Sequence, residues 1–137
     1  METNGFLQIL QGYKPFENLK NILKQEKNKT ISIDGLASGA KVHIVSSLIN
    51  DMKKSVLWIA KNQKDAEKIS NMAEFYGTKA FVLPEHEFIY YEVYAGSEDD
   101  KRTSINFFKN FYNKTPGLFI VTHVAFLSPV TKRENVL

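Results

Sequence analysis

The sequence predicts an α/β fold: three layers, with a parallel sheet flanked by helices. Short runs of β-branched and aromatic residues alternate with amphipathic segments four times, at spacings of about 25 to 40 residues. The run over residues 55–60 is almost continuously apolar, as expected for a strand that is covered on both faces. The 137 residues, 43% hydrophobic and 24% charged, suit one globular domain with an apolar core.

The elements follow in order from hydrophobic periodicity and from glycine and proline breaks. The expected strands are residues 29–33, 55–60, 80–83 and 118–122. The expected helices are residues 6–27, 40–52, 62–76 and a third crossover helix marked by Ile105, Phe108, Phe111 and Tyr112, with a short helix over residues 123–127. Gly77 ends the helix over residues 62–76, and Pro84 ends the strand over residues 80–83.

We divide the chain into three parts. Residues 1–28 are a helical lead-in, residues 29–130 an α/β subdomain, and residues 131–137 the start of a connection to a following domain. The sequence ends without a closing glycine or polar tail, so we expect it to be cut from a longer protein.

Composition argues against several classes of protein. The net charge of +3 is too small, and the lysines too scattered, to indicate a nucleic-acid surface. The absence of cysteine excludes disulfides and thiolate metal sites. No secretory leader is evident and no apolar run approaches the roughly 20 residues that span a bilayer. We therefore expect a cytoplasmic protein without a membrane partner.

Residues 31–42, ISIDGLASGAKV, are similar to a phosphate-binding loop between a strand and a helix. A working loop reads G-x-x-x-x-G-K-[S/T]: the second glycine lets amides approach the phosphates, the lysine reaches the terminal phosphates and the hydroxyl coordinates magnesium. Gly35 and Lys41 match this pattern. Ala40 stands at the second glycine and Val42 at the hydroxyl, while Gly39 lies one residue early.

Both departures weaken nucleotide chemistry. The Cβ of Ala40 crowds the phosphate, and Val42 offers no oxygen to a magnesium ion that demands near-ideal oxygen coordination. No acidic pair follows a later strand, since residues 118–122 run into His123. We expect a vestigial loop in a P-loop NTPase-like or helicase-like fold, with no catalytic residue, no metal and no bound cofactor.

Other candidate residues are weaker. His43, His86 and His123 lack the spacing of metal ligands. Tyr90, Tyr91 and Tyr94 could stack on nucleic-acid bases, although we favour aromatic side chains that hold a long loop against the sheet.

The segment over residues 84–92, PEHEFIYYE, followed by Arg102, resembles the amino-terminal region of the bacterial transcription-repair coupling factor family. The loop at residues 35–41 resembles that family's degenerate phosphate loop, and residues 56–60 and 120–127 resemble its second strand and its fourth strand with the helix that follows. The resemblance covers roughly residues 15–135. Its motif positions are Pro84, Glu85, Glu87, Tyr91, Glu92 and Arg102.

The resemblance implies a function that composition and spacing do not. Members are ATP-dependent DNA translocases that displace stalled RNA polymerase and recruit excision-repair proteins. Their amino-terminal module resembles the excinuclease B protein, lacks ATPase function, contacts the excinuclease A protein and restrains a downstream motor that uses ATP and magnesium. This chain would be the first, non-catalytic subdomain, with partners in the same chain, the excinuclease A protein, RNA polymerase and DNA.

Two alternatives stay open. An active nucleotide-binding domain of an excinuclease B-like helicase would hold phosphates with Gly39 and Lys41 in a shifted loop, although Ala40 and Val42 argue against it. A nucleic-acid-binding module would use the tyrosines at positions 90, 91 and 94 with nearby lysines, and its affinity would fall steeply with salt.

Overall fold

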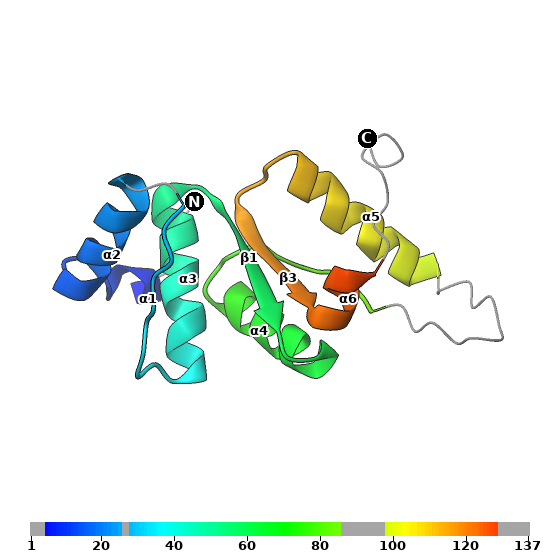
Figure 1. The fold of residues 1–137 in the computed structure, drawn as a ribbon, viewed down its shortest axis with the longest axis horizontal. Helices are drawn as coiled ribbons and strands as arrows, with labels where there is room; N and C mark the ends of the chain where they lie inside the picture. Colours follow the sequence, from blue (N-terminus) through cyan, green and yellow to red (C-terminus); the bar gives the residue numbers. More distant parts are fainter. Residues whose placement is uncertain (1–4, 26–27, 86–97, 129–137) are drawn as a thin grey trace.

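Three parallel strands and the helices that flank them make up residues 5–25, 28–85 and 98–128, the part of the chain that the computed structural model describes (Figure 1). The strands are β1 (Ser55–Ala60), β2 (Ala80–Val82) and β3 (Gly117–Thr122). The helices are α1 (Gly5–Gln8), α2 (Lys14–Gln25), α3 (Ser38–Met52), α4 (Gln63–Phe75), α5 (Glu98–Tyr112) and α6 (His123–Leu127). The predicted α/β class and parallel sheet are confirmed. Within these ranges, no helix is both long enough and apolar enough to cross a membrane.

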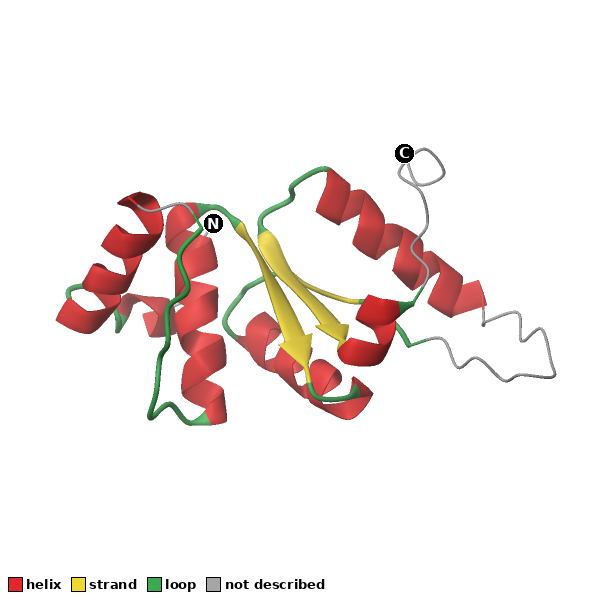
Figure 2. Ribbon diagram, viewed as in Figure 1, coloured by secondary structure: helices red, strands yellow, loops and turns green. Residues whose placement is uncertain are grey.

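Strand β3 lies in the centre of the sheet, between β1 and β2. Leu118 and Ile120 join an apolar cluster with α3 and α4, whereas Phe119 and Val121 join a second cluster with α5 and α6. Figure 2 shows α4 and α5 on opposite sides of the strands. Every residue of β3 is buried, so this strand is covered on both faces. The prediction of such cover for residues 55–60 was wrong, because Leu57 and Ile59 of β1 are exposed on one face.

Helix α4 agrees with its prediction. Its residues Ala66, Ile69 and Ala73 are buried in the first cluster. The Asn62 side chain caps the helix by accepting the N–H of the third helical residue at 2.9 Å. Gly77 ends it with a φ of +73°, a left-handed conformation that favours glycine.

The apolar face of α5 differs from the prediction. Phe107 and Phe108 are buried, while Ile105, which we placed in the apolar stripe, is 49% exposed. The ring of Phe107 packs edge-on against Phe119 at 5.3 Å between centroids. The prediction missed this orientation because a helix with several aromatic residues offers more than one apolar stripe.

Residues 29–33 do not form the predicted strand. They are extended but pair with none of the three described strands. Ile31 and Ile33 instead line an apolar groove of about 360 Å³, together with residues of α2 and with Ile44 of α3. The prediction was wrong because alternating apolar residues suit an extended segment in a groove as well as a sheet strand.

The helical pattern at residues 6–27 divides into two helices, separated by a turn in which Gly12 has a φ of +80°. Helix α2 buries Phe16 and is tied to α3 through Lys20, whose Nζ lies 2.8 Å from Glu17 and 3.1 Å from Asp51. The hydrogen bond from Lys20 lowers the pKa of Glu17, and the same bond raises the pKa of Lys20. The lead-in therefore attaches to the sheet by way of α3.

Replacing Gly117 with alanine tests the close packing of β3 against the start of β2. The added Cβ would stand 2.9 Å from the carbonyl oxygen of Lys79 and 3.1 Å from the ring of Phe81. That carbonyl also accepts the N–H of Leu118 at 2.8 Å, so it cannot move away without weakening the bond. We expect Gly117→Ala to lower the free energy of unfolding by about 1–3 kcal/mol, measured by urea denaturation.

Gly39→Ala is the matched control. Its Cβ would meet only the Cε of Met72 at 3.4 Å, an ordinary contact, and its backbone is helical. We expect the free energy of unfolding to stay the same or to rise by up to about 1 kcal/mol, because alanine favours a helix more than glycine does. Equal unfolding midpoints for Gly117→Ala and the parent chain would contradict the close approach.

Candidate functional site

Residues 35–42, which the sequence predicts to be a vestigial phosphate loop, run into the first turn of α3. Gly35 has a φ of +76° and lies before the helix, whereas Gly39 and Ala40 are already helical. The N–H of Lys41 donates to the carbonyl oxygen of Ala37 at 3.2 Å. A working loop directs such amides at phosphate oxygens. Here the Lys41 amide is already used by the helix.

Val42 is part of the core. Its side chain is 1% exposed and lies in the cluster that contains Ile49, Ala66 and Leu118. A magnesium-binding hydroxyl at this position would need access to the ion and its waters. The structure therefore gives Val42 a packing role.

Lys41 nevertheless lies in a cleft at the carboxyl ends of β1 and β3, the edge where open α/β sheets bind ligands. The cleft has a volume of about 560 Å³. Its lining contains four basic side chains, those of Lys41, Lys61, Lys68 and His123, and one carboxylate, that of Asp65. The remaining lining residues are Ser38, Val42, Trp58, Ile59, Ala60, Ile69 and Met72. This balance attracts anions.

The polar groups at the strand ends serve as helix caps. Asp65 accepts the N–H of Lys61 at 3.3 Å, and its own N–H donates to Asn62. Thr122 is fully buried, and its Oγ1 accepts the N–H of Ala125 at 3.2 Å at the start of α6. Each side chain stabilises the turn that follows its strand.

The histidines in the described ranges lie in different surroundings. The Nε2 of His43 lies 2.6 Å from the carbonyl oxygen of Phe6, and the His43 ring stacks on Tyr76 at 4.8 Å. His43 thus joins α1 to α3 and to the end of α4, while exposed His123 lines the cleft. Within the same ranges, no three His, Asp or Glu side chains gather as a metal site. His86 lies outside the described residues.

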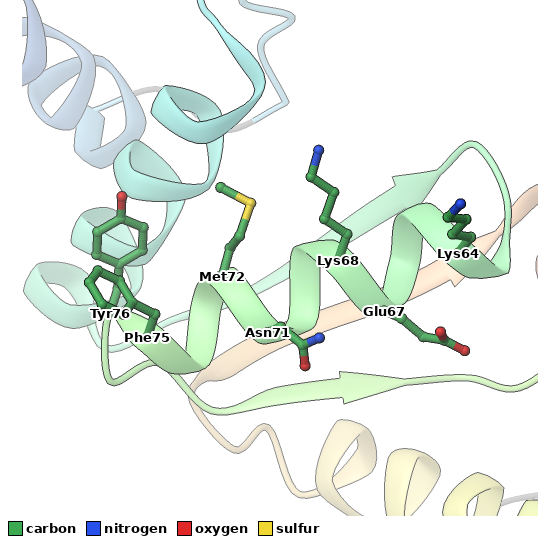
Figure 3. Close-up of a pocket in the computed structure, with 7 residues that line it drawn as sticks. All are labelled: Lys64, Glu67, Lys68, Asn71, Met72, Phe75 and Tyr76. Carbon is green, nitrogen blue, oxygen red and sulfur yellow. The ribbon is translucent and has the colours of Figure 1, made fainter.

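A second hollow, of about 610 Å³, lies along α4 and is lined by residues of that helix and Tyr76 (Figure 3). Figure 3 shows Lys68 and Met72 on one side of α4 and Asn71 on the other. Lys68 and Met72 also line the cleft beside Lys41. Since one helix supplies the lining, we place the candidate site in the cleft at the strand ends.

The family-motif positions are only partly described. Pro84 and Glu85 are half-buried just after β2, and Arg102 is exposed on α5. Glu87, Tyr91 and Glu92, like Tyr90 and Tyr94, lie outside the described residues. None of the described positions lines the cleft.

Sequence reasoning missed Lys61 and Lys68 as residues of the cleft. Lys61 follows β1 directly, and Lys68 lies on α4, the helix after that strand. The tendency of α/β sites to gather at the carboxyl ends of parallel strands would have indicated Lys61. Lys68 carries no comparable signal, because only the packing of α4 brings it to the cleft.

Replacing Val42 with threonine tests the packing role of this side chain. The added hydroxyl would be buried among apolar side chains, so we expect Val42→Thr to destabilise the chain by about 1–3 kcal/mol. We also expect no magnesium-dependent ATP binding to appear, measured by calorimetry. Val124→Thr, at an exposed position of α6, is the control and should leave stability nearly unchanged. A Val42→Thr chain that binds magnesium-ATP would contradict the packing role.

Comparison of the chain with protein-family models, curated proteins and solved structures finds no match. A functional assignment therefore rests on the ordered resemblance of the sequence, at residues 84–92, 102 and 120–127 among others, and on the geometry of residues 35–42.

Proposed function

We propose that this chain is the non-catalytic amino-terminal subdomain of a transcription-repair coupling factor. In that role it serves as a scaffold for protein contacts and restrains the motor of an ATP-dependent DNA translocase. The translocase displaces stalled RNA polymerase and recruits excision-repair proteins, including the excinuclease A protein. The family assignment rests on segments that resemble the family and follow one another in the same order. They include residues 35–41, 56–60, 84–92 with Arg102, and 120–127.

The burial of Val42 is the observation that carries the non-catalytic part of the proposal. A side chain that is 1% exposed in the core cannot be exchanged for a metal ligand without cost to the fold. The bond from the Lys41 amide to Ala37 supports the same conclusion, because that amide is already satisfied. Loss of ATPase function would thus accompany gain of a packed scaffold.

A second candidate is an active nucleotide-binding domain of an excinuclease B-like helicase. The cleft favours it in one respect: Lys41, Lys61 and Lys68 line a space at the strand ends where a polyphosphate could lie. It lacks a place for magnesium at Val42. Charge alone would then give weak, salt-sensitive anion binding without turnover.

Calorimetry with magnesium-ATP separates the two candidates. We expect no saturable micromolar binding and no phosphate release from this chain or from Lys41→Ala, and at most a weak heat that salt removes. Because Lys41 is exposed, its replacement should leave the fold intact, and circular dichroism checks this. Micromolar binding that Lys41→Ala abolishes would establish the second candidate and exclude the first.

Removal of residues 1–137 from the full-length translocase tests restraint of the motor. If these residues hold the motor in a resting state, their loss should raise DNA-stimulated ATP hydrolysis severalfold. The proposal predicts no such increase for full-length Lys41→Ala, since that lysine takes no part in turnover. An unchanged rate after the deletion would argue against a restraining role.

A further inference from the structure

Lysines precede all three described strands at one end of the sheet. They are Lys53 and Lys54 before β1, Lys79 before β2 and Lys114 before β3. The strands are parallel, and their register brings their first residues level to within one position. Figure 2 shows the loops that lead into β1 and β3 at the same end of the sheet. The four lysines therefore lie along one edge, and we call them the lysine row.

Two lysines of the row have a backbone conformation that favours glycine. Lys53 has a φ of +52° and Lys114 a φ of +54°. In this left-handed region a Cβ crowds a neighbouring carbonyl oxygen, so residues other than glycine and asparagine are uncommon. Gly77 takes the equivalent place after α4, with a φ of +73°. Two of the three turns that lead into strands thus hold a lysine where glycine is preferred.

The turns after α4 and α5 have matching hydrogen bonds. In each, the left-handed residue donates to the carbonyl oxygen three residues earlier, and the threonine after it donates to the one five residues earlier. These bonds measure 2.8 and 2.9 Å after α4, and 3.1 and 3.0 Å after α5. The motif that holds Gly77 in one turn therefore holds Lys114 in the other. The helix dipole does not require Lys114, because Lys109 already supplies a positive charge in the last turn of α5.

The charges of the lysine row are accessible and are not neutralised. All four residues are exposed, and none of them forms an ion pair with another described residue. Asp51, at the end of α3, is engaged by Lys20 at 3.1 Å. Glu74 lies exposed in the last turn of α4. This end of the sheet therefore carries more positive than negative charge.

The side chains beside the row favour a nucleic-acid duplex as its ligand. The turns that carry it, residues 53–54, 77–79 and 113–116, contain no aromatic or other large apolar residue. A protein interface needs apolar or aromatic anchors, and single-stranded nucleic acid is held largely by stacking on aromatic rings. Lysines alone suffice to hold the phosphates of a duplex. Neighbouring strands lie about 4.8 Å apart, so lysines on successive turns can contact one backbone.

We propose that the lysine row binds the phosphate backbone of a nucleic-acid duplex without reading its sequence. The spacing of the lysines in the sequence does not reveal this surface, because three separate turns supply it. The row lies at the amino ends of the strands, whereas the cleft beside Lys41 lies at their carboxyl ends. Such a contact goes beyond the scaffold role and does not depend on the family assignment.

Fluorescence anisotropy with a labelled duplex of about 20 base pairs tests the proposal. We expect saturable binding at low salt. If all four lysines contact phosphates, the binding constant should fall by roughly three to four orders of magnitude for each tenfold rise in salt. No binding at low salt, or binding that salt does not weaken, would overturn the proposal.

The double variant Lys53→Gly with Lys114→Gly separates binding from folding. Glycine suits the left-handed backbone, so we expect the urea midpoint to stay the same or to rise. The affinity for the duplex should fall at least about tenfold, and the slope of log K against log salt should become shallower by about two. A lower midpoint would give these lysines a structural role and overturn the proposal, and so would an unchanged affinity.

Two triple variants remove the same charge from different surfaces. Lys54→Gln, Lys79→Gln and Lys114→Gln change the row, whereas Lys14→Gln, Lys64→Gln and Lys101→Gln change exposed positions on α2, α4 and α5. The first set should weaken duplex binding at least about thirtyfold and the second less than about threefold. Circular dichroism checks that both fold. Equal effects would show attraction by net charge alone and overturn the proposal.

Polyglutamate is the competitor that represents an acidic protein partner. A duplex carries one charge per about 1.7 Å of its axis, and an extended polypeptide at most one per about 3.3 Å. At equal charge concentration, we therefore expect polyglutamate to displace the labelled duplex at least about tenfold less effectively than unlabelled duplex does. Equal displacement would overturn nucleic acid as the ligand in favour of an acidic polypeptide.

Discussion

The burial of β3 is the constraint on which the rest of the described structure depends. Its four central side chains, Leu118 to Val121, enter two apolar clusters in alternation, so one strand holds helices on both faces of the sheet. Each such side chain contributes about 1.5–3 kcal/mol when fully buried. Gly117 lets this strand begin close to Lys79, which sets the register of β2. Both apolar clusters therefore depend on the side chains of β3.

The position of the chain before α3 keeps residues 35–42 from the geometry of a working phosphate loop. In a working loop, a sheet strand would deliver the first glycine to the strand ends. Here Ile31 and Ile33 line the groove beside α2, and Gly35 is not among the residues that line the cleft, whereas Lys41 is. Lys41 lines a cleft with an excess of cationic side chains, while its amide serves the helix and Val42 serves the core. Sequence departures at Ala40 and Val42 agree with this geometry.

The three described strands and helices α3, α4 and α6 could be predicted from the sequence, because long apolar runs and clear stripes determine burial locally. The first strand could not, since alternation at Ile31 and Ile33 fits two environments that only tertiary packing distinguishes. The prediction of which face of α5 is buried was wrong for the same reason. Phe107 and Ile105 are both apolar, and only the packed structure shows that Phe107 contacts Phe119. At the site, Lys41 was predictable from its motif, but Lys68 reaches the cleft only through packing.

Residues 35–42 serve the fold in this account: Val42 lies in the core, and the Lys41 amide closes the first turn of α3. Two-dimensional NMR of the ¹⁵N-labelled chain during a magnesium-ATP titration tests it most directly, because it reports on each amide of the loop. We expect only a small, salt-sensitive shift near the exposed lysine, and no larger movement of the amide resonances of Gly35, Gly39, Ala40, Lys41 and Val42. Large saturable shifts at the Lys41 and Val42 amides, with loss of the helical bond to Ala37, would contradict it.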